Sequence, residues 1–152
     1  MSDRYLRVAA LKTADVFARH LASSGIDLAF DRELAPPAQS PLAAPFTFGD
    51  ARIGNRFAIL PMEGWDGTTD GAPSDLTRRR WRNFGLSGAK LIWGGEAVSV
   101  RPEGRANPHQ LMLTSSTTGA IGEPRDELLA AHTERFGSAD DVYVGLQLTH
   151  SG

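Results

Sequence analysis

The sequence contains no cysteine, and this absence excludes several kinds of chemistry at once. Without thiols the chain forms no disulfide, no zinc–thiolate or iron–sulfur site and no cysteine nucleophile. Its four histidines (His20, His109, His132 and His150) do not have the spacing of metal ligands, so we expect no metal site. A reducing compartment is compatible with this composition.

Long apolar runs and a strong charge of either sign are also missing. No stretch approaches the roughly 20 apolar residues of a membrane-spanning helix, and no run of signal-peptide length follows the N-terminus. The formal net charge of −2 over 152 residues gives no indication of nucleic acid or an anionic membrane as a partner. We therefore expect a cytoplasmic protein that binds neither. A homo-oligomer is compatible with the sequence.

One dense basic cluster, Arg78-Arg79-Arg80-Trp81-Arg82, departs from this balance. Arginines beside a tryptophan could bind phosphates or stack on bases. On a helix, however, successive side chains point in different directions, and no other segment reinforces a basic surface. We interpret the cluster as a solvated helix face with its tryptophan packed inward.

The first part of the chain predicts a helix and then a linker. Thr13 is a candidate N-cap, apolar residues recur at helical spacing after it, and Gly25 is a suitable stop for a helix over residues 14–24. Residues 36–45 hold four of the nine prolines and predict a linker. Residues 1–35 are therefore expected to be an N-terminal helical extension.

The remainder of the chain alternates strand and helix patterns. Residues 46–56 show apolar alternation around a Gly-Asp turn signal, which predicts a short hairpin. Pro124 is placed to begin a helix that Gly137 ends, and residues 98–122 are expected to be mostly loop. Strands are expected at 57–60, 90–93 and 141–148, and helices at 75–84 and 124–136. This order predicts an α/β fold with a parallel sheet.

Each predicted strand leads into a segment that carries polar groups or glycines. These segments are residues 60–66, 94–97 and 147–150. Ligands bind at the C-terminal ends of parallel strands, because the loops gather there. The paired glycines 94–95 permit close approach of a ligand, although a tight turn is the simpler interpretation.

Individual side chains in these segments suggest different chemistries. Glu63 and Asp66 are the only close pair of carboxylates in such a place, so a hydrolase or lyase with an acid and a base is one hypothesis. Gln147 offers both a donor and an acceptor, which suits the edge of a heterocycle. The structural alternative is a polar loop with Trp65 buried beneath it.

Four segments, taken in order, resemble the old yellow enzyme family, also called NADH:flavin oxidoreductases. Residues 53–62 are similar to its Asn-Arg, apolar strand and Pro-Met pattern, and residues 88–92 to its Gly-x-x-Leu-Ile strand. Residues 96–105 resemble its Glu-Ala-x-x-Val segment that leads to Gly-Arg, and residues 147–152 its Gln-Leu-x-His-x-Gly. The similarity covers about 46–152.

The resemblance implies the N-terminal part of a TIM (β/α)8 barrel, with about three of the eight strands, preceded by the hairpin and the N-terminal helix. It implies FMN at the C-terminal face, against the backbone of Leu60, Pro61 and Met62. It also implies flavin contacts from Ala97 and Gln147, with the glutamine amide at the pyrimidine edge. NADH or NADPH would donate the hydride, and the small-molecule substrate would be an activated alkene.

Two residues depart from the family pattern. Glu63 stands where many members have a threonine or cysteine that hydrogen-bonds the flavin, so it is also an expected cofactor contact. A carboxylate there would disfavour the anionic reduced ring and lower its potential. Trp65 stands where some members have a tyrosine, and an indole cannot act as an acid. Both residues are candidates for tuning the flavin or the substrate.

Length sets the last expectation. A full barrel takes about 250 residues, and the family's substrate-anchoring, proton-donating and phosphate-binding residues would follow Gly152. We therefore expect residues 46–152 to be an incomplete FMN-binding barrel that binds FMN weakly or not at all and is inactive alone. The alternatives are the hydrolase or lyase that uses Glu63 and Asp66, and a non-catalytic assembly fragment that docks through the N-terminal helix.

Overall fold

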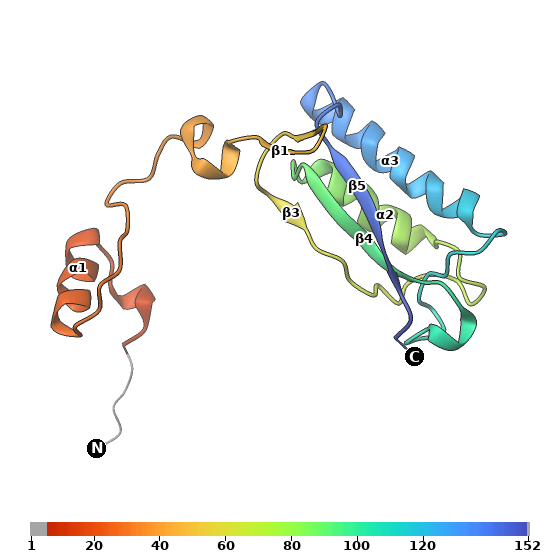
Figure 1. Ribbon diagram of the computed structural model, residues 1–152, viewed down its shortest axis with the longest axis horizontal. Helices are drawn as coiled ribbons and strands as arrows, with labels where there is room; N and C mark the ends of the chain where they lie inside the picture. Colours follow the sequence, from red (N-terminus) through yellow and green to blue (C-terminus); the bar gives the residue numbers. More distant parts are fainter. Residues whose placement is uncertain (1–5, 152) are drawn as a thin grey trace, which may run out of the picture. The chain divides into compact units, whose positions relative to one another are not determined.

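The computed structural model describes residues 6–151, with Gly94 placed only as part of its strand, and the chain divides into two compact units, Met1–Ser40 and Pro41–Gly152. Figure 1 shows the elements of each unit. Within the described residues no helix has the length and apolar character needed to span a membrane. The predicted division into extension, linker and barrel stays a prediction.

The first unit is built around one amphipathic helix. The side chain of Thr13 accepts a hydrogen bond from the Val16 N–H at 3.2 Å, and Gly25 has a φ of +66°, so both predicted ends are confirmed. Phe17 packs edge-on against Phe30, with ring centroids 4.9 Å apart, which holds the following segment against the helix. Its elements are η1 (Val8–Ala10), α1 (Ala14–Ser23) and η2 (Pro37–Gln39).

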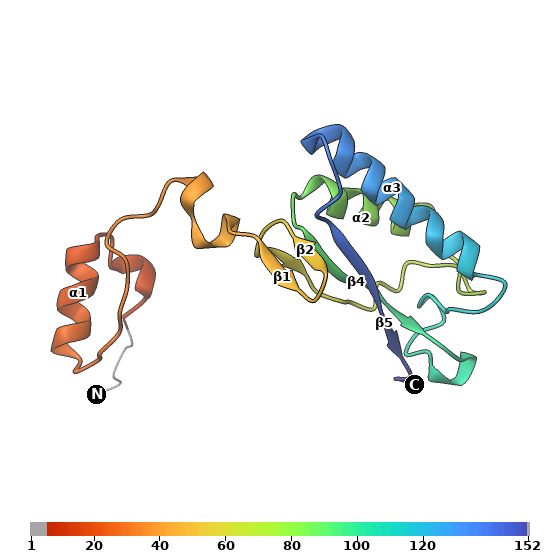
Figure 2. The same ribbon diagram turned by 45° about the horizontal axis from the view of Figure 1, so that its top comes forward.

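The second unit has a small hairpin and a three-stranded parallel sheet in the order β3-β4-β5. The sheet confirms the predicted α/β class, and the hairpin turns at Gly49 as predicted. Helices α2 and α3 lie on the same side of the sheet in both Figure 1 and Figure 2. The elements are η3 (Pro41–Ala43), β1 (Phe46–Phe48), β2 (Ala51–Ile53), β3 (Ala58–Ile59), α2 (Asp75–Leu86), β4 (Leu91–Ser99), η4 (Pro102–Gly104), α3 (Thr118–Phe136) and β5 (Tyr143–Thr149).

The core lies between the helices and one face of the sheet. Trp81 of α2, Ile92 of β4 and Leu128 of α3 are buried together, which confirms the prediction that Trp81 packs inward. Val144 and Leu146 of β5 pack on the same core. Because side chains alternate along a strand, the odd-numbered residues of β5 point to the opposite face. Gln147 and Thr149 belong to that face.

Helices α2 and α3 approach each other closely at one glycine. A Cβ built on Gly85 would lie 2.3 Å from the carbonyl oxygen of Leu128, so only glycine fits at this crossing. The helix begins with a capping box in which Ser74 and Thr77 satisfy each other's backbone N–H groups. The predicted start of α2 is confirmed, and the end extends two residues beyond Phe84.

The predicted tight turn at the paired glycines is wrong. Strand β4 runs through them to Ser99, and its register against β5 shifts between Trp93 and Ala97. Trp93 pairs with Gly145 and Ala97 pairs with Gln147, so β4 contains two more residues than its partner over this interval. The extra residues form a bulge, and glycine accommodates the local backbone.

The predicted start of the last helix is also wrong. Helix α3 begins at Thr118, and Pro124 lies inside it. In the turn that leads into α3, Thr114 and Thr117 exchange hydrogen bonds between their side chains and backbone N–H groups. Ile121 is buried against Val98 of β4, which stabilises a segment whose two glycines lower its helix propensity. Tertiary packing therefore overrides the local signal.

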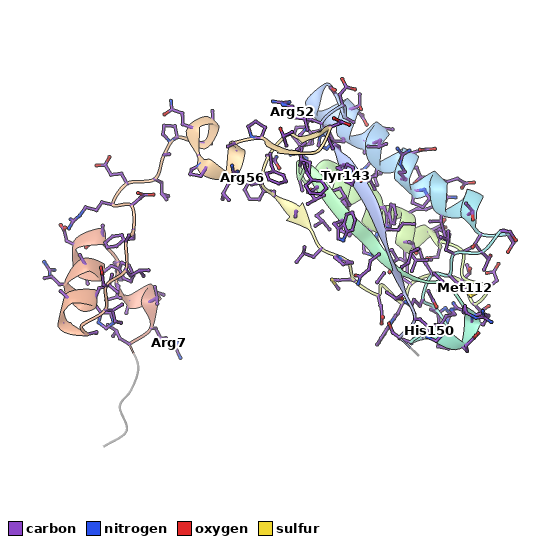
Figure 3. All side chains as sticks on the ribbon, viewed as in Figure 1. Arg7, Arg52, Arg56, Met112, Tyr143 and His150 are labelled. Carbon is purple, nitrogen blue, oxygen red and sulfur yellow. The ribbon has the colours of Figure 1, made fainter. Side chains whose placement is uncertain are left out.

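A buried polar cluster joins the helices to the N-terminal ends of the strands. The Lys90 ammonium donates to Asp141 at 2.6 Å and lies 2.8 Å from Nε2 of the fully buried His132, whose Nδ1 lies 2.8 Å from the Gly85 carbonyl. Figure 3 shows Tyr143 at this end of β5 and His150 at the other. Burial lowers the pKa of His132; its bond to Gly85 opposes this effect, and the charge of Lys90 adds to it.

Replacing Gly85 with alanine is expected to destabilise the chain by about 1–3 kcal/mol, because the new Cβ would force α2 away from α3. Gly122 is the matched control: it lies inside α3 with nothing near its Cβ position, and Gly122→Ala should stabilise by about 0.5–1 kcal/mol. Urea unfolding of both variants measures the difference. Equal effects of the two substitutions would contradict the close crossing.

The His132 cluster predicts a pH-dependent stability. The folded-state pKa lies below the unfolded value of about 6.5, so the stabilisation is complete above pH 6.5 and is lost as the pH falls below it. The free energy of unfolding, measured between pH 5.5 and 7.5, should show this loss in the wild type. His132→Gln should reduce the slope in this window. A slope that is insensitive to His132→Gln would refute the assignment.

Candidate functional site

Three predicted flavin contacts lie in one row, on β4, on β5 and in the segment that follows β3. The Ala97 N–H donates to the Met62 carbonyl at 2.9 Å, and Ala97 is the register partner of Gln147. Met62 and Gln147 are exposed, whereas Ala97 is buried. The row lies toward the end of the sheet that carries His150 in Figure 3. Segments far apart in the sequence therefore meet where ligands bind in parallel α/β proteins.

The loop after β3 presents its side chains to solvent. Leu60 and Trp65 are exposed, and Pro61 and Glu63 are half-buried. Within the described residues Glu63 has no hydrogen-bond or ion-pair partner. Trp65 has a φ of +50°, a conformation that costs a bulky residue roughly 1–3 kcal/mol, and it is not the buried tryptophan of the structural alternative. The loop therefore needs support from behind.

Asp66 supplies part of this support through α2. Arg80 donates to both carboxylate oxygens of Asp66, from Nε at 3.0 Å and from Nη2 at 2.8 Å, and the Thr77 hydroxyl adds a third bond at 2.9 Å. Burial alone would raise the pKa of Asp66, but these hydrogen bonds outweigh it and the pKa is lowered. Asp66 is therefore a fixed, ionised partner of Arg80.

Glu96, in the bulge of β4, supports the same loop from the sheet. Its side chain is 1% exposed; one carboxylate oxygen accepts from the Gly64 N–H and the other from Arg80, each at 2.5 Å. Burial raises the pKa of Glu96, and the bonds from Arg80 and Gly64 offset only part of this effect. A Cβ on Gly64 would meet the Arg80 guanidinium at 2.1 Å, so the loop approaches the arginine as closely as glycine permits.

Gln110 holds the ends of β4 and β5 together. It is fully buried, and its amide nitrogen donates to the Ala97 carbonyl at 3.0 Å and to the Thr149 hydroxyl at 3.1 Å. Its amide oxygen accepts from the Ala106 N–H at 2.8 Å. Gln110 therefore fixes the backbone beside Gln147 from the loop that follows β4.

Sequence reasoning missed three of these residues. Arg80 was assigned to a solvated face, but it lies half-buried between two carboxylates. Glu96 and Gln110 carry no local signal, because the partners that give them their roles lie far away in the sequence: Gly64 and Arg80 for Glu96, and Ala97 and Thr149 for Gln110. The role of Arg80 follows only from the structure, because it depends on the bulge that turns Glu96 inward.

The acid–base pair of the hydrolase hypothesis is not supported by this geometry. Asp66 is committed to Arg80 and Thr77, so it is not free to exchange protons with a substrate. Glu63 alone keeps an uncommitted carboxylate in the loop. In the part of the chain that the structure describes, no group of three or more histidines and carboxylates could hold a metal ion.

The fold is similar to those of two solved old yellow enzymes, whereas no protein-family model and no curated protein matches the sequence. An old yellow enzyme homologue from Zymomonas mobilis matches 73% of the chain with a TM-score of 0.54 and 23% identity. Old Yellow Enzyme from a Pichia species matches 76% with a TM-score of 0.54 and 16% identity. The chain covers 28% of each of those proteins. The resemblance expected from the sequence is thus confirmed in the fold.

Alanine substitutions at Gln110 and Gln147 distinguish a glutamine that supports the fold from one that is expected to contact a ligand. Gln110→Ala is expected to cost about 1–3 kcal/mol, because it leaves the Ala97 carbonyl and the Ala106 N–H without their partner. Gln147→Ala, at an exposed position, should change stability by no more than about 0.5 kcal/mol. Urea unfolding without added ligand measures both. A larger cost for Gln147→Ala would show that the exposed amide is structural.

Proposed function

We propose that the chain is the flavin-contacting part of an FMN-dependent oxidoreductase of the ene-reductase type, which transfers hydride from NADH or NADPH to an activated alkene. The observation that carries the proposal is the row of Met62, Ala97 and Gln147, in a fold similar to that of old yellow enzymes. A cytoplasmic location is part of the proposal. The two solved proteins extend well beyond the matched part, so the activity concerns the whole gene product.

The residues of the row fit the edge of a flavin ring. Gln147 is exposed on the face opposite the helices, and its amide can donate and accept at once. Leu60 and Met62 offer exposed apolar surface, 70% and 69% accessible, on which an aromatic ring could lie. Bound FMN would accept and pass on the hydride. The chain's own residues would bind and orient the ring and exclude water from one side.

Glu63 and Trp65 set this chain apart within the proposed class. We infer that an unpaired carboxylate beside the ring disfavours negative charge on it and so lowers its reduction potential. Trp65 cannot supply a proton, so the proton for the substrate would come from another group. Glu63→Thr should therefore raise the potential of the bound flavin.

A barrel hydrolase or lyase is the weaker proposal, since one of its two carboxylates is held by Arg80. A non-catalytic assembly fragment is a third proposal, with the first unit as its docking element. Exposed apolar residues in that unit, including Leu34 at 97% and Val8 at 71%, support it. Neither proposal requires a bound flavin.

The test is the colour of the protein expressed from its own gene together with any coding sequence that follows codon 152. It should purify with, or take up, FMN and show flavin absorbance that NADH or NADPH bleaches. Gln147→Leu should weaken FMN binding by about tenfold or more, because a hydrogen-bonded edge would lose its partners. Gln39→Leu, in the first unit, is the control for a surface glutamine. A folded, colourless protein that takes up no FMN would overturn the proposal.

A further inference from the structure

A single guanidinium lies beside the candidate flavin loop and bonds the two carboxylates that hold it, those of Asp66 and Glu96. Besides both oxygens of Asp66, Arg80 donates from Nη2 to Glu96 at 2.5 Å and from Nη1 to the Gly95 carbonyl at 3.1 Å. Its guanidinium carbon lies 5.9 Å from the ring centroid of Phe84 on the same helix. The planar fork therefore joins α2, the bulge of β4 and the loop after β3.

The loop is anchored at several backbone and side-chain points. Ala97 holds the Met62 carbonyl, Glu96 holds the Gly64 N–H, and Arg80 holds the carboxylate of Asp66. Two of these contacts are made by Arg80 or by the carboxylate that it orients, and the hydroxyls of Ser74 and Thr77 hold the Asp66 carbonyl from the start of the same helix. Trp65, between them, keeps its left-handed backbone because its neighbours on both sides are fixed.

We propose that Arg80 is a positioning residue: it fixes the backbone of residues 62–66 so that this loop presents a rigid surface to the flavin. This inference rests on the proposed function for its ligand, but not for its geometry. Arg80 would not touch the flavin; it would act through Asp66 and Glu96. Its loss would weaken FMN binding by releasing the loop, not by removing a contact.

The arrangement requires an arginine and not simply a positive charge. Four donor–acceptor contacts leave the guanidinium in fixed directions, two of them to one carboxylate. A lysine ammonium is a point charge on a flexible stem and cannot make the bidentate pair. Glu96 also needs a cation beside it, because a buried carboxylate without one becomes neutral or destabilises the fold.

Helix α2 offers a matched control. Arg78 lies on the same helix and pairs with Glu123 and Glu127 of α3, away from the loop. Arg78→Lys therefore removes a guanidinium fork from α2 without touching residues 62–66. Arg80→Lys and Arg78→Lys are compared in the full chain, and both keep the net charge.

Hydrogen exchange tests the geometry without any flavin. In Arg80→Lys the amide of Gly64 should exchange about tenfold faster or more, while amides of α3 and β5 keep the wild-type rate. Arg78→Lys should leave Gly64 unchanged. Arg80→Met should have a larger effect than Arg80→Lys; if it does not fold, the lysine variant carries the test. Equal Gly64 exchange in the two lysine variants overturns the proposal.

FMN titration of the whole gene product tests the part of the proposal that concerns flavin binding. Arg80→Lys should weaken FMN binding by about tenfold, whereas Arg78→Lys, even where it lowers the melting temperature equally, should not. If Gly64 exchange changes as expected but the wild type takes up no FMN, the proposed function fails and the positioning role of Arg80 is supported. If FMN binds equally well to both variants, the positioning role toward the flavin is overturned while the proposed function stands.

Discussion

The backbone pairing of β4 with strands on both sides is the constraint on which the rest of this structure depends. It brings the segments after β3 and within β5 to the same level, so Met62 and Gln147 lie on either side of Ala97. The two extra residues of β4 could have destroyed this alignment. Because they are absorbed in one bulge, Ala97 returns to register and Glu96 turns toward Arg80 and the loop.

Each end of the sheet is held by a half-buried cation between groups from different elements. At the start of the strands, Lys90 lies between Asp141 and the neutral His132; at the other end, Arg80 lies between Asp66 and Glu96. Buried charges are costly unless paired, so both clusters specify geometry more than they add stability. The Lys90 ammonium makes one ion pair, with Asp141. The planar guanidinium of Arg80 makes several hydrogen bonds in fixed directions, which a lysine could not make.

Local signals in the sequence predicted what local physics determines. The cap at Thr13, the turn at Gly49 and the start of α2 at Asp75 each depend on residues within a few positions. The start of α3 could not be read in the same way, since burial of Ile121 stabilises a glycine-bearing segment. The residues that support the candidate site could not be predicted either, because their roles depend on tertiary contacts. Gln110, for example, bonds residues of β4 and β5.

The electrostatics of the loop give the proposed site its individual character. One cation, Arg80, faces Asp66 and Glu96, and the third carboxylate, Glu63, has no partner among the described residues. Burial raises the pKa of Glu96, and the bonds from Arg80 and Gly64 oppose this effect. A flavin ring bound against this loop would be reduced beside unpaired negative charge, which opposes the gain of an electron pair. Under the proposed function, the row of strand-end residues would contact the flavin, and the unpaired Glu63 carboxylate would bias the ring toward a low reduction potential.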